Sequence, residues 1–249
     1  MSDLTAPGVK ATEEGGLMGS LRRVVRVVYS PTKVFEELDR RPDWLVPLII
    51  CILVAAISSW VLIPNVILPA QREALESRGL TEDQLDAARP WLEGSRPLYI
   101  GLASAVVVGA LSFIIVAGVF HLIFTLLLGG QANFARTFAV VVYSFVIGVL
   151  ASMLKVPIEL ITKRTEGLTS LGLLLGKPEA SSGFAYRFAY KFMDQFDVFN
   201  LWILVLLGIG FSIIFKFSRQ KSYVVVCGLW LLFVLAVSLL GGMVPGRAG

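Results

Sequence analysis

Long unbroken runs of apolar residues alternate with short polar segments along this chain of 249 residues. A helix that crosses the hydrocarbon core of a bilayer needs about 20 consecutive apolar residues. Because apolar positions are continuous rather than alternating, the runs predict helices and exclude a membrane β-barrel. The expected fold class is all-α: a polytopic membrane protein, with residues 45–243 forming a five-transmembrane-helix bundle that carries interfacial amphipathic helices. The predicted spans are residues 45–64, 98–128, 137–157, 198–217 and 222–243.

The composition agrees with this prediction. Apolar residues make up 56% of the chain and charged residues 16%, whereas soluble domains are typically about 45–50% apolar and about 25% charged. The formal net charge of +4 is a mild excess, and Lys and Arg beside membrane spans are its ordinary source. Nucleic-acid binding is therefore not expected, and the lipid bilayer is the first expected partner.

The segment before the first apolar run divides in two. Residues 1–16 are polar without periodicity and predict a disordered tail, whereas residues 17–44 predict cytoplasmic amphipathic and juxtamembrane helices. Arg22, Arg23 and Arg26 share one side of a helical wheel, and Leu and Val fill the rest. These arginines are candidate contacts for anionic lipid or a protein partner. The alternative is a flank that only sets the membrane topology.

A second short helix is predicted at the entry to the first span. Ser30 followed by Pro31 is typical of a helix start, because proline at the first helical position lacks an N–H that would be unpaired in any case. Arg40 and Arg41 suit the negative end of the helix dipole. Trp44 then lies where an indole would straddle the headgroup boundary.

An aromatic segment precedes the fourth predicted span. Phe184, Phe188, Phe192 and Phe196 recur at every fourth position, and Arg187 and Lys191 lie between them. This pattern predicts a helix that lies in the interface, with its rings in the headgroup layer and its cations toward phosphates. Arg187 and Lys191 are therefore further candidate contacts for lipid or a partner.

Five spans place the two termini on opposite sides of the membrane, but the overall charge does not choose between the two orientations. The connections on alternate sides carry 11 Lys and Arg residues each. Short connections count most in the positive-inside rule, and the arm beside the first span and the turn Ser218–Lys221 are both short and basic. We therefore expect the N-terminus in the cytoplasm and the tail, residues 244–249, outside.

Small residues recur at intervals of four within the predicted spans, and such spacing lets membrane helices approach closely. The three sets are Gly101, Ala105 and Gly109; Ser144, Gly148 and Ser152; and Gly208 with Ser212.

Few polar groups lie within the apolar runs, where they would be costly and therefore informative. The candidates are His121, Lys155 and Glu159. We expect His121 to bond to a neighbouring helix or to water, with a proton or ligand role as the alternative. Lys155 and Glu159 lie one turn apart, and we expect them to form a solvated flank. The residues predict no catalytic site, no metal site and no cofactor.

Three segments of the chain form a recognisable set in a fixed order. They are the entry from Ser30-Pro31 to Trp44-Leu45, the turn Gly129-Gly130 with Thr137-Phe138 and Tyr143-Ser144, and Asp197 to Trp202 with Gly208-Ile209-Gly210-Phe211. Together they resemble the bacterial branch of the Yip family of five-span membrane proteins, named for interacting with Ypt/Rab GTPases. The resemblance covers about residues 20–243, and the order and spacing of the segments are more specific than any one motif. It implies a five-helix bundle with a cytoplasmic N-terminus and, in eukaryotic members, a link to vesicle trafficking.

The expected function is that of a non-enzymatic Yip-type protein in the bacterial cytoplasmic membrane, which acts as a scaffold or adaptor in membrane organisation and trafficking. Its expected partners are lipid, including anionic lipid, and an unidentified protein, with a second copy of the chain as one choice. The alternative is a small-solute transporter or channel subunit. Such proteins usually carry ionisable groups or broken helices at mid-depth, and the sequence shows neither.

Overall fold

The computed structural model describes residues 16–76, 82–163, 169–178 and 182–243, so the predicted disordered tail lies almost wholly outside the described residues. Within these ranges the chain is helical, and its one β feature is an isolated bridge between Ser170 and Asp197. Among the described residues, four helices are long and apolar enough to cross a membrane, and an apolar helix of 17 residues, α11 (Val198–Ile214), is shorter. The four are Leu45–Glu73, Arg96–Leu127, Phe134–Thr162 and Arg219–Met243.

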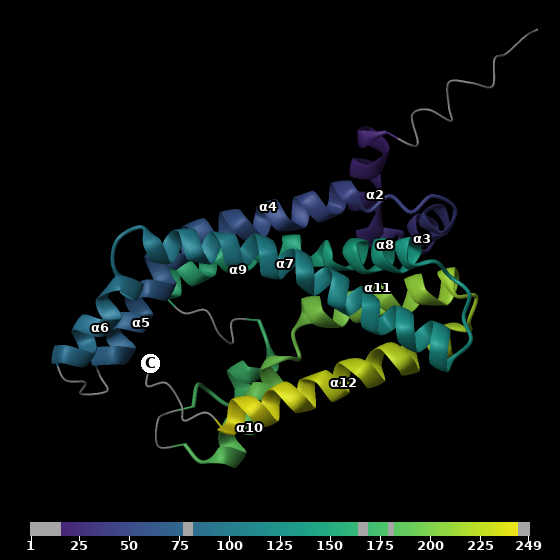
Figure 1. Cartoon of the computed structure of the whole chain (residues 1–249). Helices are drawn as coiled ribbons and strands as arrows, with labels where there is room; N and C mark the ends of the chain where they lie inside the picture. Colours follow the sequence, from purple (N-terminus) through teal and green to yellow (C-terminus); the bar gives the residue numbers. More distant parts are fainter. Residues whose placement is uncertain (1–15, 77–81, 164–168, 179–181, 244–249) are drawn as a thin grey trace, which may run out of the picture.

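The long helices lie roughly side by side along one direction (Figure 1). In the apolar 18-residue stretch of Phe134–Thr162, 67% of the residues are buried, against 11% in the corresponding stretches of Leu45–Glu73 and Arg96–Leu127. Eight residues of α8 (Phe134–Phe145) and ten of α11 are buried. The bundle is thus built around α8 and α11, and the apolar surfaces of α4 (Leu45–Leu62), α7 (Arg96–Leu122) and α12 (Arg219–Met243) face outward.

The first predicted span does not end at Pro64. The helix passes through a π-helical stretch, η1 (Ile63–Ile67), and continues as α5 (Leu68–Glu76). Proline lacks the N–H that an α-helix would use, and the wider π turn carries the chain past it, with Leu68 N–H bonded to the Ile63 carbonyl. α6 (Glu82–Leu92) follows before α7. A second π stretch, η2 (Ile123–Leu127), ends the second long helix.

The third predicted span, residues 137–157, consists of two helices. α8 and α9 (Ile147–Thr162) meet at Val146, and α9 runs beyond the predicted end with Pro157 inside it. The described connection that follows α9 contains a short 3₁₀ helix, η3 (Leu171–Leu174), and α10 (Phe184–Asp194).

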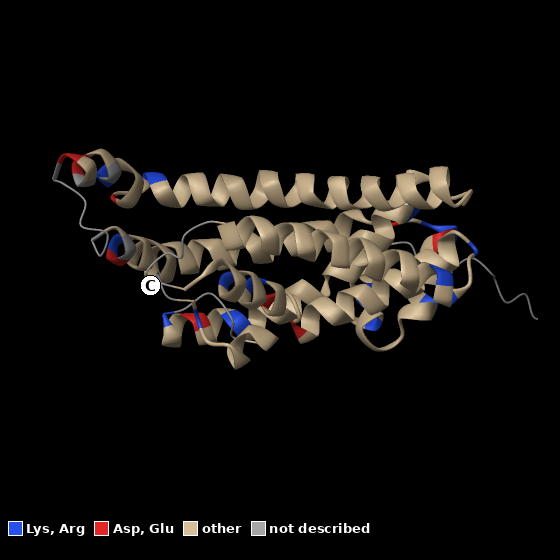
Figure 2. Ribbon diagram, turned by 90° about the horizontal axis from the view of Figure 1, so that it is seen from below, with Lys and Arg blue, Asp and Glu red and all other residues tan. Residues whose placement is uncertain are grey.

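The connections between the long helices gather at alternate ends. Asp39, from the N-terminal arm, bonds to Arg136 after the second long helix and to Lys216 before α12. At the other end, Lys163 Nζ donates to the Asn65 carbonyl at 3.3 Å. Figure 2 shows charged residues at both ends of the long helices and a further group part-way along them. The arm, the turn after the second long helix and the turn before α12 therefore lie at one end.

Candidate functional site

The N-terminal arm is a pair of short helices docked on the bundle. α2 (Leu17–Tyr29) and α3 (Pro31–Arg40) meet at Ser30, with Pro31 at the first helical position as the sequence predicts. The Ser30 side chain makes no cap hydrogen bond. Val34, Phe35 and Leu38 of α3 are fully buried, and α3 packs on α8 and α11. The arm is therefore part of the core and is held at a fixed place.

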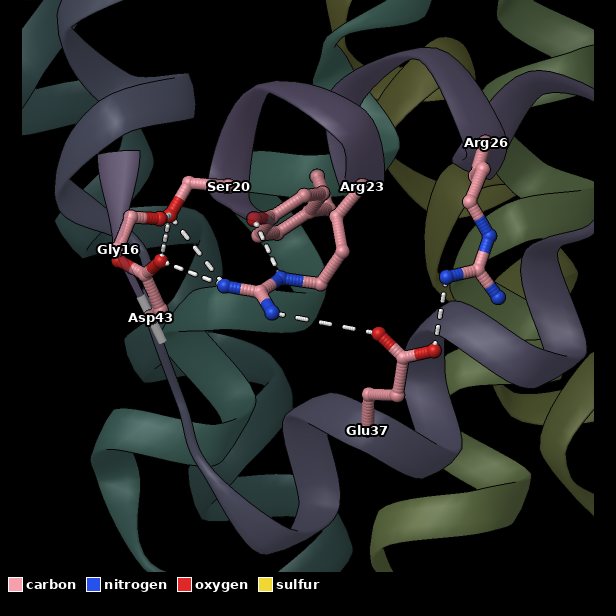
Figure 3. Close-up of polar contacts among 7 residues, drawn as sticks. Gly16, Ser20, Arg23, Arg26, Glu37 and Asp43 are labelled. Carbon is pink, nitrogen blue, oxygen red and sulfur yellow. Dashed lines mark hydrogen bonds and ion pairs between the residues drawn. The ribbon is translucent and has the colours of Figure 1, made fainter. Parts of the chain in front are cut away.

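Arg23, on the buried side of α2, is the centre of a cluster of polar side chains (Figure 3). Its Nη2 lies 2.8 Å from Asp43 Oδ2, and its Nε donates to Tyr143 Oη at 3.4 Å. Ser20 donates to the same Asp43 carboxylate, and Glu37 lies 4.0 Å away on the other side of the guanidinium. One arginine thereby links α2, the entry to α4 and the buried helix α8.

The surroundings of Arg23 stabilise its charge. Burial lowers the pKa of this guanidinium, but the hydrogen bonds and charges of Tyr143 and Asp43 outweigh burial and raise the pKa. A charged group with 7% of its surface exposed needs such partners, because an unpaired buried charge is very costly. The cluster is therefore a permanently charged link between elements.

This geometry corrects the prediction for the basic face of α2. Arg23 is buried, and Arg26 pairs with Glu37 at 2.9 Å, so these two arginines face the protein instead of lipid. Arg22 is exposed. Asp43 and Glu37 come from segments after α2, and only the folded arm brings them to its basic side.

A second ionic contact fixes the far end of the arm. Arg136 Nη1 lies 3.2 Å from Asp39 Oδ1, and Lys216 bonds to the other oxygen of this carboxylate. Arg219 also reaches Thr32 at 3.4 Å. From the sequence, the helix dipole explains the cations at the end of α3. No local pattern predicts that Asp39 pairs with two cations from other parts of the chain.

The aromatic segment forms α10 as predicted, but the helix packs along α12. Phe184 lies beside Gly242 near the end of α12, and Phe196 stacks edge-on against Trp230 further back, with ring centroids 5.0 Å apart. The two helices are therefore antiparallel, and Figure 1 shows α10 beside the far half of α12. The rings thus lie along α12, where Gly242 leaves room for Phe184, and Phe184 still exposes 44% of its surface.

The two cations of α10 also differ from prediction. Arg187 Nε donates to the Gly242 carbonyl at 3.1 Å and its Nη1 donates to the Ser182 carbonyl at 2.6 Å. It therefore satisfies a carbonyl at the end of α12, where helical carbonyls lack partners. The stem of Lys191 lies against Gly241, and its nitrogen is 5.9 Å from the Tyr190 ring centroid.

Lys155 and Glu159 do not form the expected solvated flank. Lys155 Nζ lies 3.0 Å from Asp197 Oδ2, and Glu159 is 8% exposed. Asp197 caps α11 by accepting from the Phe199 N–H at 2.8 Å, and Thr169 also donates to it. The folded chain thus supplies Lys155 with a partner that helical spacing does not reveal. An aspartate directly before the apolar run is the one sequence signal for this role.

The charge of Asp197 is stabilised by these contacts. Burial alone raises the pKa of an aspartate, but the hydrogen bonds from Thr169, Lys155 and the Phe199 N–H, with the Lys155 charge, outweigh burial and lower the pKa. The carboxylate therefore remains ionised.

His121 lies near the end of the second long helix. Its Nδ1 is 3.0 Å from Thr137 Oγ1 on α8, and its ring stacks edge-on against Phe134 with centroids 5.6 Å apart. The arrangement links two helices, which is the packing role that the sequence favours.

Comparison with protein-family models gives one match: the model described as Yip1 domain covers residues 25–240. The matched region begins within α2 and ends within α12, so it includes most of the arm and every long helix. Comparisons with curated proteins and with solved structures give no match.

Proposed function

Because the chain belongs to the Yip1 domain family and carries apolar helices of membrane-spanning length, it is an integral membrane protein, and we propose that it is a non-enzymatic scaffold or adaptor. In this role it organises the membrane, or membrane trafficking, through contacts with lipid and protein. We place it in the bacterial cytoplasmic membrane with its N-terminus in the cytoplasm.

We further propose that α11 completes a bundle of five spans. A helix of 17 residues is about 26 Å long, close to the roughly 30 Å of a hydrocarbon core. The contacts of Asp39 with Arg136 and Lys216 support this count. They place the arm, the turn that precedes α8 and the turn that precedes α12 on one side. Two of these segments can share a side only when an even number of spans separates them, and between Arg136 and Lys216 this requires α11 to be a span.

The observation that carries the proposed function is the docked arm. Three ion pairs hold the arm together and on the bundle: Arg26–Glu37 joins α2 to α3, Arg23–Asp43 joins α2 to the entry to α4, and Asp39–Arg136 joins α3 to α8. A surface on rigidly held elements suits recognition, because little conformational entropy is lost when a partner binds. The arm thereby offers a fixed cytoplasmic surface to a partner.

Photo-crosslinking in native membranes tests this role. A photoreactive residue replaces Glu36, which is exposed on α3, and crosslinked species are identified with and without Arg23→Glu, which separates the arm from Asp43. We expect a discrete protein adduct that is lost in the Arg23→Glu background and kept in an Arg22→Gln control. A Glu36 position that yields no protein adduct, or one whose adducts ignore the Arg23 substitution, would overturn the adaptor proposal.

One observation favours the alternative, a small-solute transporter or channel subunit. The sequence shows no broken helix, yet the third predicted span breaks at Val146. The Lys155–Asp197 ion pair joins the second half of this span to the start of α11. Proton flux into vesicles, followed with an entrapped pH dye under a potassium diffusion potential, tests it. Flux that needs the protein and is lost in Asp197→Asn would favour a transporter; a flux equal to that of empty vesicles would count against a proton pathway.

A further inference from the structure

The outer face of α2 is apolar, the reverse of the face that the arginines suggest. Met18 is 72% exposed, Val25 62% and Tyr29 72%, and Leu21 is also exposed. These residues are spaced by three or four, so they form one stripe along the helix. The buried side of the same helix holds Ser20 and Arg23. The arm therefore places a charged residue inside and an apolar stripe outside.

The position of α2 indicates what the stripe meets. Figure 1 shows α2 running across the direction of the long helices, where α4 begins, and α2 packs against α4. Trp44 precedes the first residue of α4, and tryptophan favours the level of the membrane interface. A helix that crosses the spans at this level lies in the plane of the interface.

The helix α4, against which α2 packs, carries an apolar surface that lipid must cover. Leu45, Ile49, Leu53 and Ile57 of α4 are all exposed and are spaced by four, so they form the outward face of a predicted span. The helix α2 itself carries no Asp or Glu, and Arg22 lies on its exposed side. An apolar stripe with a cation and no acid suits the boundary between acyl chains and phosphates.

We propose that α2 inserts the stripe of Met18, Leu21, Val25 and Tyr29 into the cytoplasmic leaflet, with Arg22 extended toward lipid phosphates. The insertion widens the footprint of the protein in one leaflet, beside the first span. The inference deepens the proposed function and rests on it only for the side of the membrane on which the arm lies.

Nitroxide scanning of the full-length protein tests the insertion. Cys51 and Cys227 are replaced by serine, single cysteines are placed at Met18, Val25 and Glu36, and each spin-labelled protein is reconstituted into vesicles of phosphatidylcholine and phosphatidylglycerol. Accessibility is measured to oxygen, which concentrates in acyl chains, and to an aqueous nickel complex. We expect a severalfold higher oxygen-to-nickel ratio at 18 and 25 than at 36, the polar control on α3.

Two results would overturn the proposal. A ratio at position 25 equal to that at position 36 would place the stripe in water. Low accessibility to both reagents, with spin–spin broadening between labels, would place a second copy of the chain on it. Equal thermal unfolding midpoints of the labelled proteins show that all are folded. The crosslinking experiment at Glu36 tests the adaptor role, and the nitroxide experiment tests the insertion. Either proposal can therefore fail without the other.

Discussion

At the scale of single residues, several charged groups of this protein are paired across long sequence distances. Arg23 is bonded to Tyr143 and Asp43, and Lys155 to Asp197. In an apolar setting an unsatisfied donor or charge is costly, so each pair fixes the relative position of the elements that carry it. These pairs therefore specify how the arm and the α11 start are placed.

Replacing Arg23 should destabilise the protein strongly. Arg23→Gln leaves Asp43 and Tyr143 without their cationic partner, and we expect a loss of about 2–4 kcal/mol in the free energy of unfolding. Thermal unfolding in detergent measures it, with Arg22→Gln as the matched control, for which the change should stay within about 0.5 kcal/mol. Equal effects of the two substitutions would show that the Arg23 cluster does not hold the arm.

Asp197 should make stability depend on acid. Its pKa is lowered in the folded protein, so it stabilises the fold fully above the ordinary aspartate value of 3.8, and this stabilisation is lost as the pH falls through the folded value. The unfolding midpoint of the wild type should therefore drop more between neutral pH and pH below 3.8 than that of Asp197→Asn. Parallel curves for the two proteins would contradict the assigned pairing.

At the scale of elements, glycines decide where helices touch. A Cβ at Gly210 of α11 would lie 2.4 Å from Val140 Cγ1 of α8, and one at Gly208 would lie 2.3 Å from the Tyr223 ring. At Gly109 and Gly148 nothing lies within 4 Å. A Cβ at Gly101 would also lie close to a neighbour, 2.2 Å from Ile63 Cδ1. The spacing of four therefore marks close packing at Gly101 and Gly208 but not at Gly109 or Gly148, because spacing alone does not say which face meets another helix.

Filling the contact at Gly210 should weaken the bundle. Gly210→Ala forces apart α8 and α11 near the buried Phe35 of the arm, and overpacking of this kind costs about 1–3 kcal/mol. Gly148→Ala is the control, since its site is open. The unfolding midpoints in detergent compare the two; a Gly210→Ala protein as stable as the control would mean that the helices adjust without cost.

The turn between the second and third long helices shows the same dependence on glycine. Gly129 adopts φ +71°, a conformation that favours glycine, and a Cβ at Gly130 would lie 2.6 Å from the Phe215 ring. Asn133 then caps α8 by accepting from the Arg136 N–H at 3.0 Å. The turn thereby places Arg136 beside Asp39 of the arm.

At the scale of the whole molecule, the connections alternate between two ends. The arm, the Gly129 turn and the turn before α12 share one end, and the segment around Asn65 meets Lys163 at the other. With the five spans proposed above, these ends face opposite compartments. The docked arm therefore lies at the same end as the short, basic turn before α12.

Cysteine labelling in intact cells checks this arrangement. Single cysteines replace Lys33, Gln131 or Glu93, all exposed, in a protein whose Cys51 and Cys227 are serine. A membrane-impermeant maleimide should label position 93 in intact cells, and positions 33 and 131 only after permeabilisation. Labelling of 33 and 131 from opposite sides would contradict the five-span arrangement, and the reverse pattern at all three would contradict the orientation.

The sequence by itself determined that this chain is an all-helical membrane protein, because runs of apolar side chains long enough to cross a bilayer have no other stable setting. It also determined the start of α3 at Pro31 and of α4 at Leu45, where proline and the onset of apolar residues act locally. The family resemblance rests on such local features in a fixed order, and the match over residues 25–240 confirms it.

The tertiary structure decided which residues face inward. A helical wheel groups Arg22, Arg23 and Arg26 on one side, but only the folded arm brings Asp43 and Glu37 to two of them. Asp197 likewise reaches Lys155 from a distant segment, and α10 lies along α12, where Gly242 leaves room for the Phe184 ring. Burial and pairing depend on neighbours that are remote in sequence, so a local pattern predicts a face but not its partner.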